Sequence, residues 1–458
     1  MKTKNYITFV MVLALCCVCS CESFTEVELP ETQLTGPAVY EEVSTADAAL
    51  ADIYARMRET GMVSGTAYGL SSLMGNYADD FVFYSNNLEL QQFNLHTLVP
   101  SNNQLTNLWN TSYGQIYAAN ALLEGVNNSS VISGADRDRL RGEALFIRAY
   151  LHFYLIGLFG DVPYIKTTDY HQNIVAEKIQ EAQAYQMVNT DLLEAETLLS
   201  DEYSSAERVN PNKSTVRALL ARLSLYRENW EQAEAYASAV IENPLYTWET
   251  NVVNVFLKTN PSIIWSFHPG VAGLNTKDAR TFVFSVGPPS KPALSPALVG
   301  AFETGDLRRV NWVKTVTSGA NTWYCPFKYK KTLATTPSQE YTILFRMAEQ
   351  YLIRAEARAH LEDISGAQQD LNKIRLRAGL PNTVANDSPS LLNAIVNERR
   401  FEFFTEMGHR WFDLKRTGNA SSILSIIKPE WQDTDLLLPL PEAELLLNPN
   451  LLPQNPGY

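Results

Sequence analysis

Apolar residues recur every three or four positions through most of this 458-residue chain, a spacing typical of helices with one buried face. The first such stripe consists of Ala46, Leu50, Ile53, Tyr54 and Met57. Gly61 predicts the end of this helix, and Ser44 with Asp47 has the spacing of a capping box at its start. The pattern therefore predicts an amphipathic helix between residues 44 and 61.

The same spacing predicts three further helices before residue 200. A second helix has Trp109 and Asn120 on one face, and a third runs from Asp136 to Gly160. A fourth covers residues 185–199. Helical periodicity over such lengths indicates a mainly α fold.

Two later helix pairs have matching small residues. The pairs are expected over residues 214–227 with 230–242, and 347–360 with 366–376. Ala221 and Ala233 stand twelve positions apart, as do Ala355 and Ala367. A small residue in each helix lets the two helices cross closely, as tetratricopeptide-like units require. Such units bury a core only by stacking, so several are expected, and the first four helices can supply two more.

Two long stretches break the helical pattern. Residues 250–342 contain a β-prone run at 262–267, two consecutive prolines at 288–289 and many Gly and Asn residues, which predicts irregular structure with short strands and little helix. An Asn-rich stretch from Asn76 to Asn107 interrupts the N-terminal helices. Long loops on a helical scaffold are the usual place for binding residues.

The N-terminus has the pattern of a bacterial lipoprotein signal. Lys2 and Lys4 precede an apolar run from Ile7 to Cys19, which is too short to span a bilayer. Among the four cysteines near its end, Cys21 alone follows a small residue with an aliphatic residue at −3. We predict a signal peptide over 1–20, a lipid on Cys21 and an acidic tether over 21–37. An ordinary signal peptide cut near the same place is the alternative.

Composition and charge narrow the class of protein. The chain is 45% hydrophobic and 11% aromatic, which excludes a disordered protein and allows a large core. Its formal net charge is −13, and a nucleic-acid binder of this size would normally have a basic face. Nucleic acid is therefore not an expected partner.

Signatures of catalysis and of metal binding are missing from the sequence. It contains no HExxH, nucleophile elbow, P-loop or dinucleotide fingerprint, and its six histidines lack metal-ligand spacing. Cys325 has no activating neighbour in sequence and is expected to be a plain buried thiol. Glu398 and Glu402 lie four apart among arginines, which favours a structural ion network over a catalytic carboxylate pair. We expect no enzyme activity, no cofactor and no metal.

Several motifs resemble those of the SusD/RagB family of Bacteroidetes surface lipoproteins, in the family's order across nearly the whole mature chain. They are residues 142–150, 158–163, 305–309, 354–361, 370–380, 398–404, 408–416, 438–442 and 448–458. At 458 residues the chain is shorter than many members of that family, which suggests trimmed loops.

The resemblance implies a superhelix of about four tetratricopeptide-like helical hairpins, with a loop-rich ligand-binding face and few short strands. It divides the mature chain into an N-terminal helical region at 38–249 and a C-terminal region at 250–458, the latter with a loop-rich insertion at 250–342. It also implies a non-enzymatic lipoprotein of the outer membrane that faces the exterior and delivers a captured glycan to a SusC-type TonB-dependent transporter. Peptide capture is the alternative, and a surface glycosidase is a remote one.

Glycan capture requires aromatic platforms flanked by amide, carboxylate or guanidinium groups. Two loop regions have this composition, and our candidates in them are Tyr84, Asn87, Trp323 and Tyr324, followed by Trp265 and His268. Peptide capture would use the backbone-binding amides of the Asn-rich loops, namely Asn86, Asn87, Asn94, Asn102, Asn103 and Asn107. A glycosidase would use Asp79 or Asp80 with a distant carboxylate.

Overall fold

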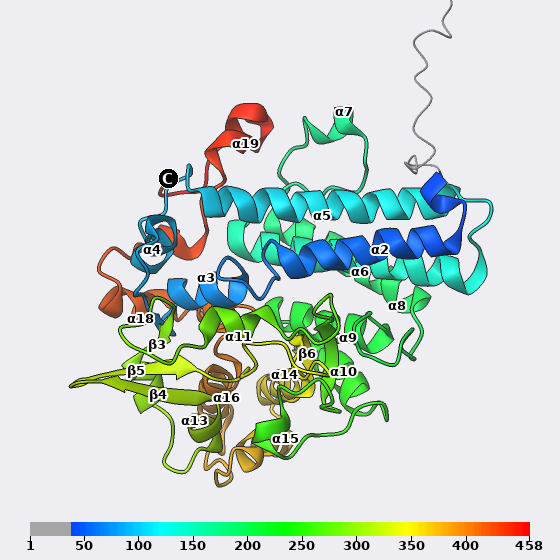
Figure 1. Cartoon of the computed structure of the whole chain (residues 1–458). Helices are drawn as coiled ribbons and strands as arrows, with labels where there is room; N and C mark the ends of the chain where they lie inside the picture. The colour runs from blue at the N-terminus through cyan, green and yellow to red at the C-terminus, as the bar shows by residue number, and fades with distance from the viewer. Residues whose placement is uncertain (1–37) are drawn as a thin grey trace, which may run out of the picture.

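The computed structural model describes residues 38–458, so the predicted signal peptide, the lipidation of Cys21 and the tether lie outside the described residues. Eight helices of 12 to 26 residues pack in four pairs (Figure 1). These pairs are α2 (Val43–Glu59) with α5 (Asn103–Asn128), α6 (Gly134–Phe159) with α8 (Glu181–Leu198), α9 (Lys213–Tyr226) with α10 (Trp230–Ile241), and α14 (Met347–His360) with α15 (Ile364–Arg377).

The four pairs stack in chain order. Helix α5 packs against α6, α8 against α9 and α10 against α14, while α16 (Ser388–Phe403) covers the last pair. Each pair buries its apolar faces against the next, which is how tetratricopeptide-like units acquire a core. The predicted mainly α superhelix of about four hairpins is confirmed.

The matched alanines lie where the paired helices cross. Ala221 and Ala233 belong to one buried cluster, and Ala355 and Ala367 to another, with no exposed surface on any of the four. A larger side chain at these positions would force the two helices apart.

Helix α6 is the core of the scaffold. It is long and apolar enough to cross a membrane, yet its most apolar stretch is completely buried inside the protein. Gly160 ends it with a φ of +72°, a backbone conformation that L side chains rarely adopt. Its apolar character is thus explained by packing against α5 and α8.

The start of α2 differs from the prediction. The helix begins at Val43, before the expected Ser44, and no side chain among residues 38–458 caps its first turn. Ser44 Oγ instead donates a hydrogen bond of 3.1 Å to the Glu42 carboxylate. The predicted capping box is therefore wrong, although the buried stripe of Ala46, Leu50 and Ile53 is as expected.

The segments outside the helix pairs form two small antiparallel sheets. One has the order β1 (Phe81–Val82), β3 (Ala293–Leu294), β5 (Asn321–Pro326) and β4 (Val313–Ser318). The other joins β2 (Ile263–Phe267) to β6 (Thr342–Arg346). Leu294 stands opposite Phe81 on one side and Tyr324 on the other, so the first sheet joins the two loop-rich regions (Figure 1).

Short helices complete the chain. They are α3 (Leu70–Tyr77), α4 (Leu88–Leu95), α7 (Tyr170–Asn173), α11 (Lys277–Phe282), α12 (Pro296–Gly300), α13 (Leu307–Asn311), α17 (His409–Arg416), α18 (Ala420–Ile427) and α19 (Glu442–Leu447), with 3-10 turns at Ala38–Tyr40, Val252–Asn254, Asp433–Leu436 and Pro449–Leu451. Three of these helices, α11 to α13, lie within residues 250–342.

The charged residues of α16 form a buried ion network, as predicted. Glu402 pairs with Arg308, Arg346 and Arg377, and Arg308 also reaches Glu398 at 2.6 Å. Burial by itself raises the pKa of Glu402, but the surrounding guanidinium groups outweigh it and hold that pKa below its usual range. The network ties α16 to the loop region and to β6, so its role is structural.

Candidate functional site

The predicted residues of the first loop lie at the edge of the four-stranded sheet. Tyr84 follows β1 and is 38% exposed, so its ring is available to a ligand. Asn87 is half-buried and caps α4, because its Oδ1 accepts a hydrogen bond of 3.1 Å from the Leu90 amide. Tyr84 is therefore the accessible aromatic group of this loop, whereas Asn87 already has a structural role.

Trp323 and Tyr324 do not form one platform. They are neighbours on β5, and successive side chains of a strand point to opposite faces of the sheet. Trp323 is 8% exposed and packs with Cys325 against residues 283–287, whereas Tyr324 packs on the side of Phe81. The guanidinium carbon of Arg309 lies 5.4 Å from the centre of the Tyr324 ring.

Trp265 belongs to the core. Its side chain has no exposed surface, and its Nε1 donates a hydrogen bond of 3.0 Å to the carbonyl of Val209. Its ring meets Phe146 and Tyr150 edge to face. The choice of Trp265 as a ligand contact is therefore wrong, because the β-prone run around it lies against α6 instead of in a surface loop.

His268 lines a cavity of about 610 Å³ beside α2. This cavity, called the loop-face groove below, is bounded by α2, residues 204–210 and residues 267–270. Its lining residues with polar or aromatic side chains are Asp47, Tyr54, Arg58, Arg139, Ser204, Ser205, Asn210, Phe267 and His268. Of these residues, the sequence patterns predicted only His268 as a ligand contact. Tyr54 belongs to the apolar stripe that predicted a buried helix face, and no sequence motif includes Asn210.

The polar groups of the loop-face groove are held in place by neighbouring elements. Tyr54 donates a hydrogen bond of 2.6 Å to the buried Glu143 carboxylate, and Asn210 donates one of 3.0 Å to the same oxygen. Arg58 donates one of 3.3 Å to the carbonyl of His268. Burial lowers the pKa of His268, so its imidazole is neutral at neutral pH. Phenol, amide, guanidinium and neutral imidazole together suit hydrogen bonding to a polyhydroxylated ligand.

The carboxylates considered for a glycosidase lie inside the protein. Asp79 is held by Arg410 at 2.6 Å and by Arg400 at 2.7 Å, and Asp80 is almost completely buried beside it. Burial and the charge of Asp79 raise the pKa of Asp80 to about 7. Neither carboxylate lines the loop-face groove.

Most amides proposed for peptide capture already bond within the fold. Asn94 donates to the carbonyl of Asn76, Asn102 donates to Glu89 and Gln92, and Asn103 reaches the Glu89 carboxylate. These side chains stabilise the packing of α4 against the start of α5. Within residues 38–458 no cluster of three or more His, Cys, Asp or Glu side chains could hold a metal ion. Cys325 is buried and free, as predicted.

Comparison with known proteins supports the motif resemblance. A family model described as "Starch-binding associating with outer membrane" matches residues 31–225, and the SusD family model matches residues 310–458. SusD-like proteins P25 and P2 of Formosa agariphila are 24% and 27% identical, over 100% and 99% of this chain and the whole of each relative.

Solved structures share the fold. A SusD superfamily protein of Bacteroides vulgatus covers 92% of this chain and 100% of its own, with a TM-score of 0.81 and 21% identity. Surface glycan-binding protein A of Bacteroides thetaiotaomicron, solved with laminarihexaose, covers 90% of this chain and 99% of its own, with a TM-score of 0.77 and 18% identity. A laminarin-binding SusD-like protein has a TM-score of 0.76 at 24% identity, over 91% of this chain and 99% of that protein. With family models matching both halves and four stacked helix pairs, this chain belongs to the SusD/RagB family.

Proposed function

We propose that this protein captures oligosaccharides on its loop face, at the loop-face groove and at the exposed Tyr84. The observation that carries the proposal is the groove itself, where Tyr54, Arg58, Asn210 and His268 present hydrogen-bonding groups around a cavity of about 610 Å³. The laminarin-binding relative and the laminarihexaose complex support this ligand class.

Calorimetry against a panel that includes laminarihexaose, maltohexaose and xylohexaose tests this proposal. Each of the substitutions His268→Ala and Tyr84→Ala is expected to lower the affinity for the bound glycan at least tenfold. Tyr170→Ala on α7 is the matched control, because it removes another exposed tyrosine away from the groove. Unchanged affinity in both test variants would show that the loop face is not the binding site.

We also propose that the protein acts without catalysis. Asp79 and Asp80, the carboxylates considered for hydrolysis, are held inside the fold and do not reach the groove. Incubation of the purified protein with the same oligosaccharides is expected to release no new reducing ends. Release that Asp79→Asn or Asp80→Asn abolishes would contradict this.

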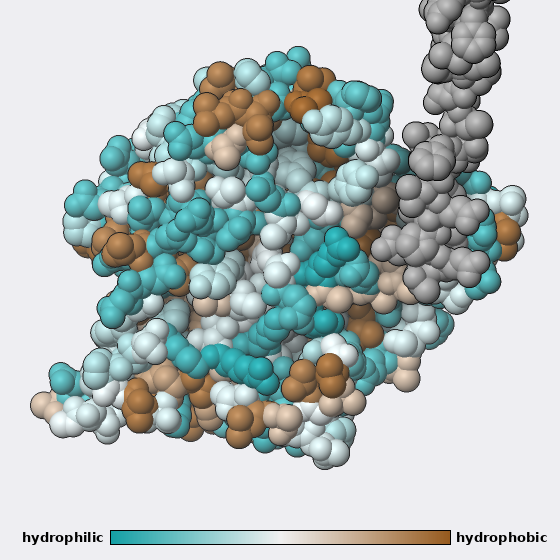
Figure 2. All heavy atoms as spheres, turned by 45° about the horizontal axis from the view of Figure 1, so that its top comes forward, coloured by the Kyte–Doolittle hydropathy of each residue, from teal (hydrophilic) through white to brown (hydrophobic). Residues whose placement is uncertain are grey.

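The expected partner is a SusC-type TonB-dependent transporter in the outer membrane, with the protein anchored through a lipid on Cys21 and facing the exterior. The outer-membrane association named in the matching family model supports this location. Exposed apolar residues of α19 and next to α7, among them Leu446, Leu447 and Val175, support a protein partner (Figure 2).

The anchoring proposal is tested on whole cells. Cys21→Ala is expected to leave a folded, glycan-binding protein that is released from the membrane and no longer supports uptake. Antibody or protease access to the wild-type protein on intact cells tests the side of the membrane. Shielding until the outer membrane is broken would assign the protein to the periplasmic side.

A further inference from the structure

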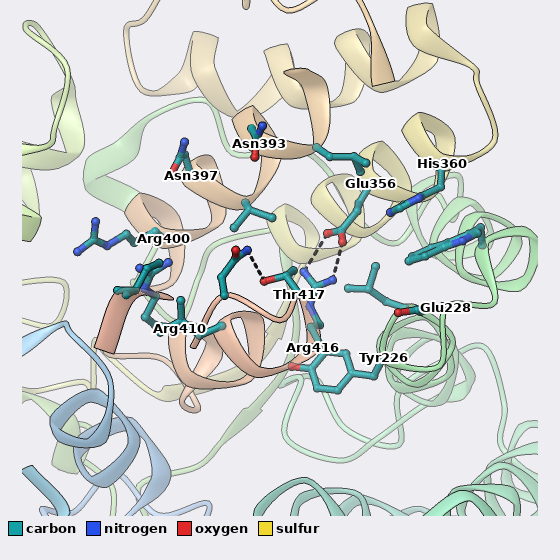
Figure 3. Close-up of a pocket in the computed structure, with 17 residues that line it drawn as sticks. Tyr226, Glu228, Glu356, His360, Asn393, Asn397, Arg400, Arg410, Arg416 and Thr417 are labelled. Atoms are coloured by element: carbon teal, nitrogen blue, oxygen red, sulfur yellow. Dashed lines mark hydrogen bonds and ion pairs between the residues drawn. The ribbon is translucent and has the colours of Figure 1, made fainter. Parts of the chain in front are cut away.

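A second cavity, of about 630 Å³, lies among the C-terminal helices and shares no lining residue with the loop-face groove. We call it the scaffold pocket. It opens between α16 on one side and α17 with the turn to α18 on the other, and the turn between α9 and α10 closes one end (Figure 3). Its volume falls within the roughly 300–1,000 Å³ usual for small-ligand sites.

One end of the scaffold pocket is aromatic. The rings of Trp230 and His360 stack with centroids 3.7 Å apart and an interplanar angle of 7°. Trp230 is half-buried and His360 is exposed at the end of α14. Leu392 and Val396 of α16 add apolar surface between this stack and the other end. Flat apolar surfaces of this kind match the C–H faces of a pyranose ring.

The other end of the scaffold pocket contains two guanidinium groups, those of Arg400 and Arg410. Arg400 and Arg410, both labelled in Figure 3, share the carboxylate of Asp79. Arg410 donates to it through Nε and Nη2, and Arg400 through Nη2 alone. The Nη1 of each makes no hydrogen bond within residues 38–458. Arg400 and Arg410 carry two positive charges beside the Asp79 carboxylate and the Asp80 carboxyl, whose pKa is raised to about 7. Positive charge therefore remains in excess at this end at neutral pH, in a chain whose formal charge is −13.

The rim between the two ends carries free amides. Asn393 and Asn397 lie one helical turn apart on α16, are exposed, and make no side-chain hydrogen bond in the described part of the chain. Asn419 uses only its Nδ2, which donates to Thr417 at 2.9 Å. Asn393 and Arg400 are seven residues apart, so this wall is roughly 10 Å long.

We propose that the scaffold pocket binds a short acidic oligosaccharide. A sugar ring packs against the Trp230–His360 stack, hydroxyl groups bond to the amides of Asn393 and Asn397, and a carboxylate or sulfate meets Arg400 and Arg410. The ligand class rests on the proposed glycan function, but the site and the preference for negative charge are independent of the loop face.

The test uses trigalacturonate, neutral laminaritriose and a neutral tripeptide as probes of the full mature protein. Calorimetry is expected to show trigalacturonate binding, weakened by added salt because the ion pair is screened. The double variant Asn393→Ala/Asn397→Ala and the single variant His360→Ala each lose at least tenfold in affinity for it. Both change exposed side chains, so the fold is retained, and His268→Ala leaves this binding unchanged.

A matched control is Gln183→Ala/Gln186→Ala, which removes two exposed amides one helical turn apart on α8, away from the scaffold pocket. Absence of trigalacturonate binding, or binding that neither pocket variant weakens, would overturn the proposal. So would capture of the tripeptide with no binding of trigalacturonate. If His268→Ala and Tyr84→Ala leave glycan affinity unchanged while the pocket variants abolish trigalacturonate binding, the loop-face function fails and the scaffold pocket stands.

Discussion

Arg410 of α17 donates two hydrogen bonds, of 2.6 and 2.9 Å, to the carboxylate of Asp79, which lies just before β1. The two residues are more than 300 positions apart, and both side chains are at most 7% exposed. The pair therefore ties the C-terminal helices to the strand that precedes the Tyr84 loop. A bidentate guanidinium–carboxylate pair fixes orientation as well as distance.

Asp79→Ala is expected to destabilise the protein by about 3–5 kcal/mol, because it leaves Arg410 buried without its partner. Urea unfolding measures the change. Asp52→Ala is the control, since its pair with Arg56 has a similar distance, 2.6 Å, but both side chains are more than half exposed. That variant is expected to lose less than about 1 kcal/mol. Equal losses in the two variants would contradict the structural role of Asp79.

Trp265→Ala and Tyr84→Ala are expected to separate stability from binding. Removing the buried Trp265 ring leaves a cavity against α6 and should cost about 3–5 kcal/mol of unfolding free energy. Tyr84 is exposed, so its loss should change stability by less than about 0.5 kcal/mol while reducing glycan affinity. A stable Trp265→Ala protein with weakened glycan binding would return Trp265 to the candidate site.

Asp80 should make stability depend on pH. Its pKa is about 7 in the native protein, against an ordinary value of 3.8, so the native state keeps a proton that the unfolded chain has already released. Stability therefore falls as pH rises from about 4 to 7, and the loss persists at higher pH.

Asp80→Asn removes this titration and retains the shape of the side chain. The variant is expected to be more stable than the wild type at pH 8 by about 1–3 kcal/mol, with a much smaller difference at pH 5. Urea unfolding of both proteins at the two pH values provides the comparison. A stability difference that is the same at pH 5 and pH 8 would show that the carboxylate does not titrate as proposed.

Cys325 should be unreactive in the native protein. Its thiol is buried, and burial raises its pKa to about 11, so very little thiolate exists at neutral pH. In residues 22–458 it is the only cysteine, which makes a thiol assay specific. Labelling is expected to be slow in buffer and rapid in urea. Val384→Cys adds a thiol at a 95% exposed position and should react at once. Rapid labelling of native Cys325 would indicate local opening around β5.

Periodicity in the sequence was sufficient to predict the helical scaffold. The buried stripe of α2, the length of α6 and the alanines spaced twelve apart depend on relations within a helix or between adjacent helices, and the structure contains all of them. The predicted cap of α2 failed because Ser44 Oγ donates to the Glu42 carboxylate, a contact that the spacing of Ser44 and Asp47 does not indicate. The family motifs lie partly in these helices and partly in α16, α17 and the C-terminal segment.

The candidate site depended on contacts between distant segments, which only the tertiary structure decided. Trp265 and Trp323 are aromatic residues of the kind that bind glycans, but both are buried. Trp265 packs against α6, and Trp323 packs against residues 283–287. Asp79 changes from a candidate catalytic acid into an ion-pair partner once α17 supplies Arg410. The loop-face groove combines α2 with segments more than 140 residues further along, and no local spacing encodes such a meeting. Local propensity determines which residues form helices, whereas packing of distant elements determines which aromatic and charged side chains remain free to bind.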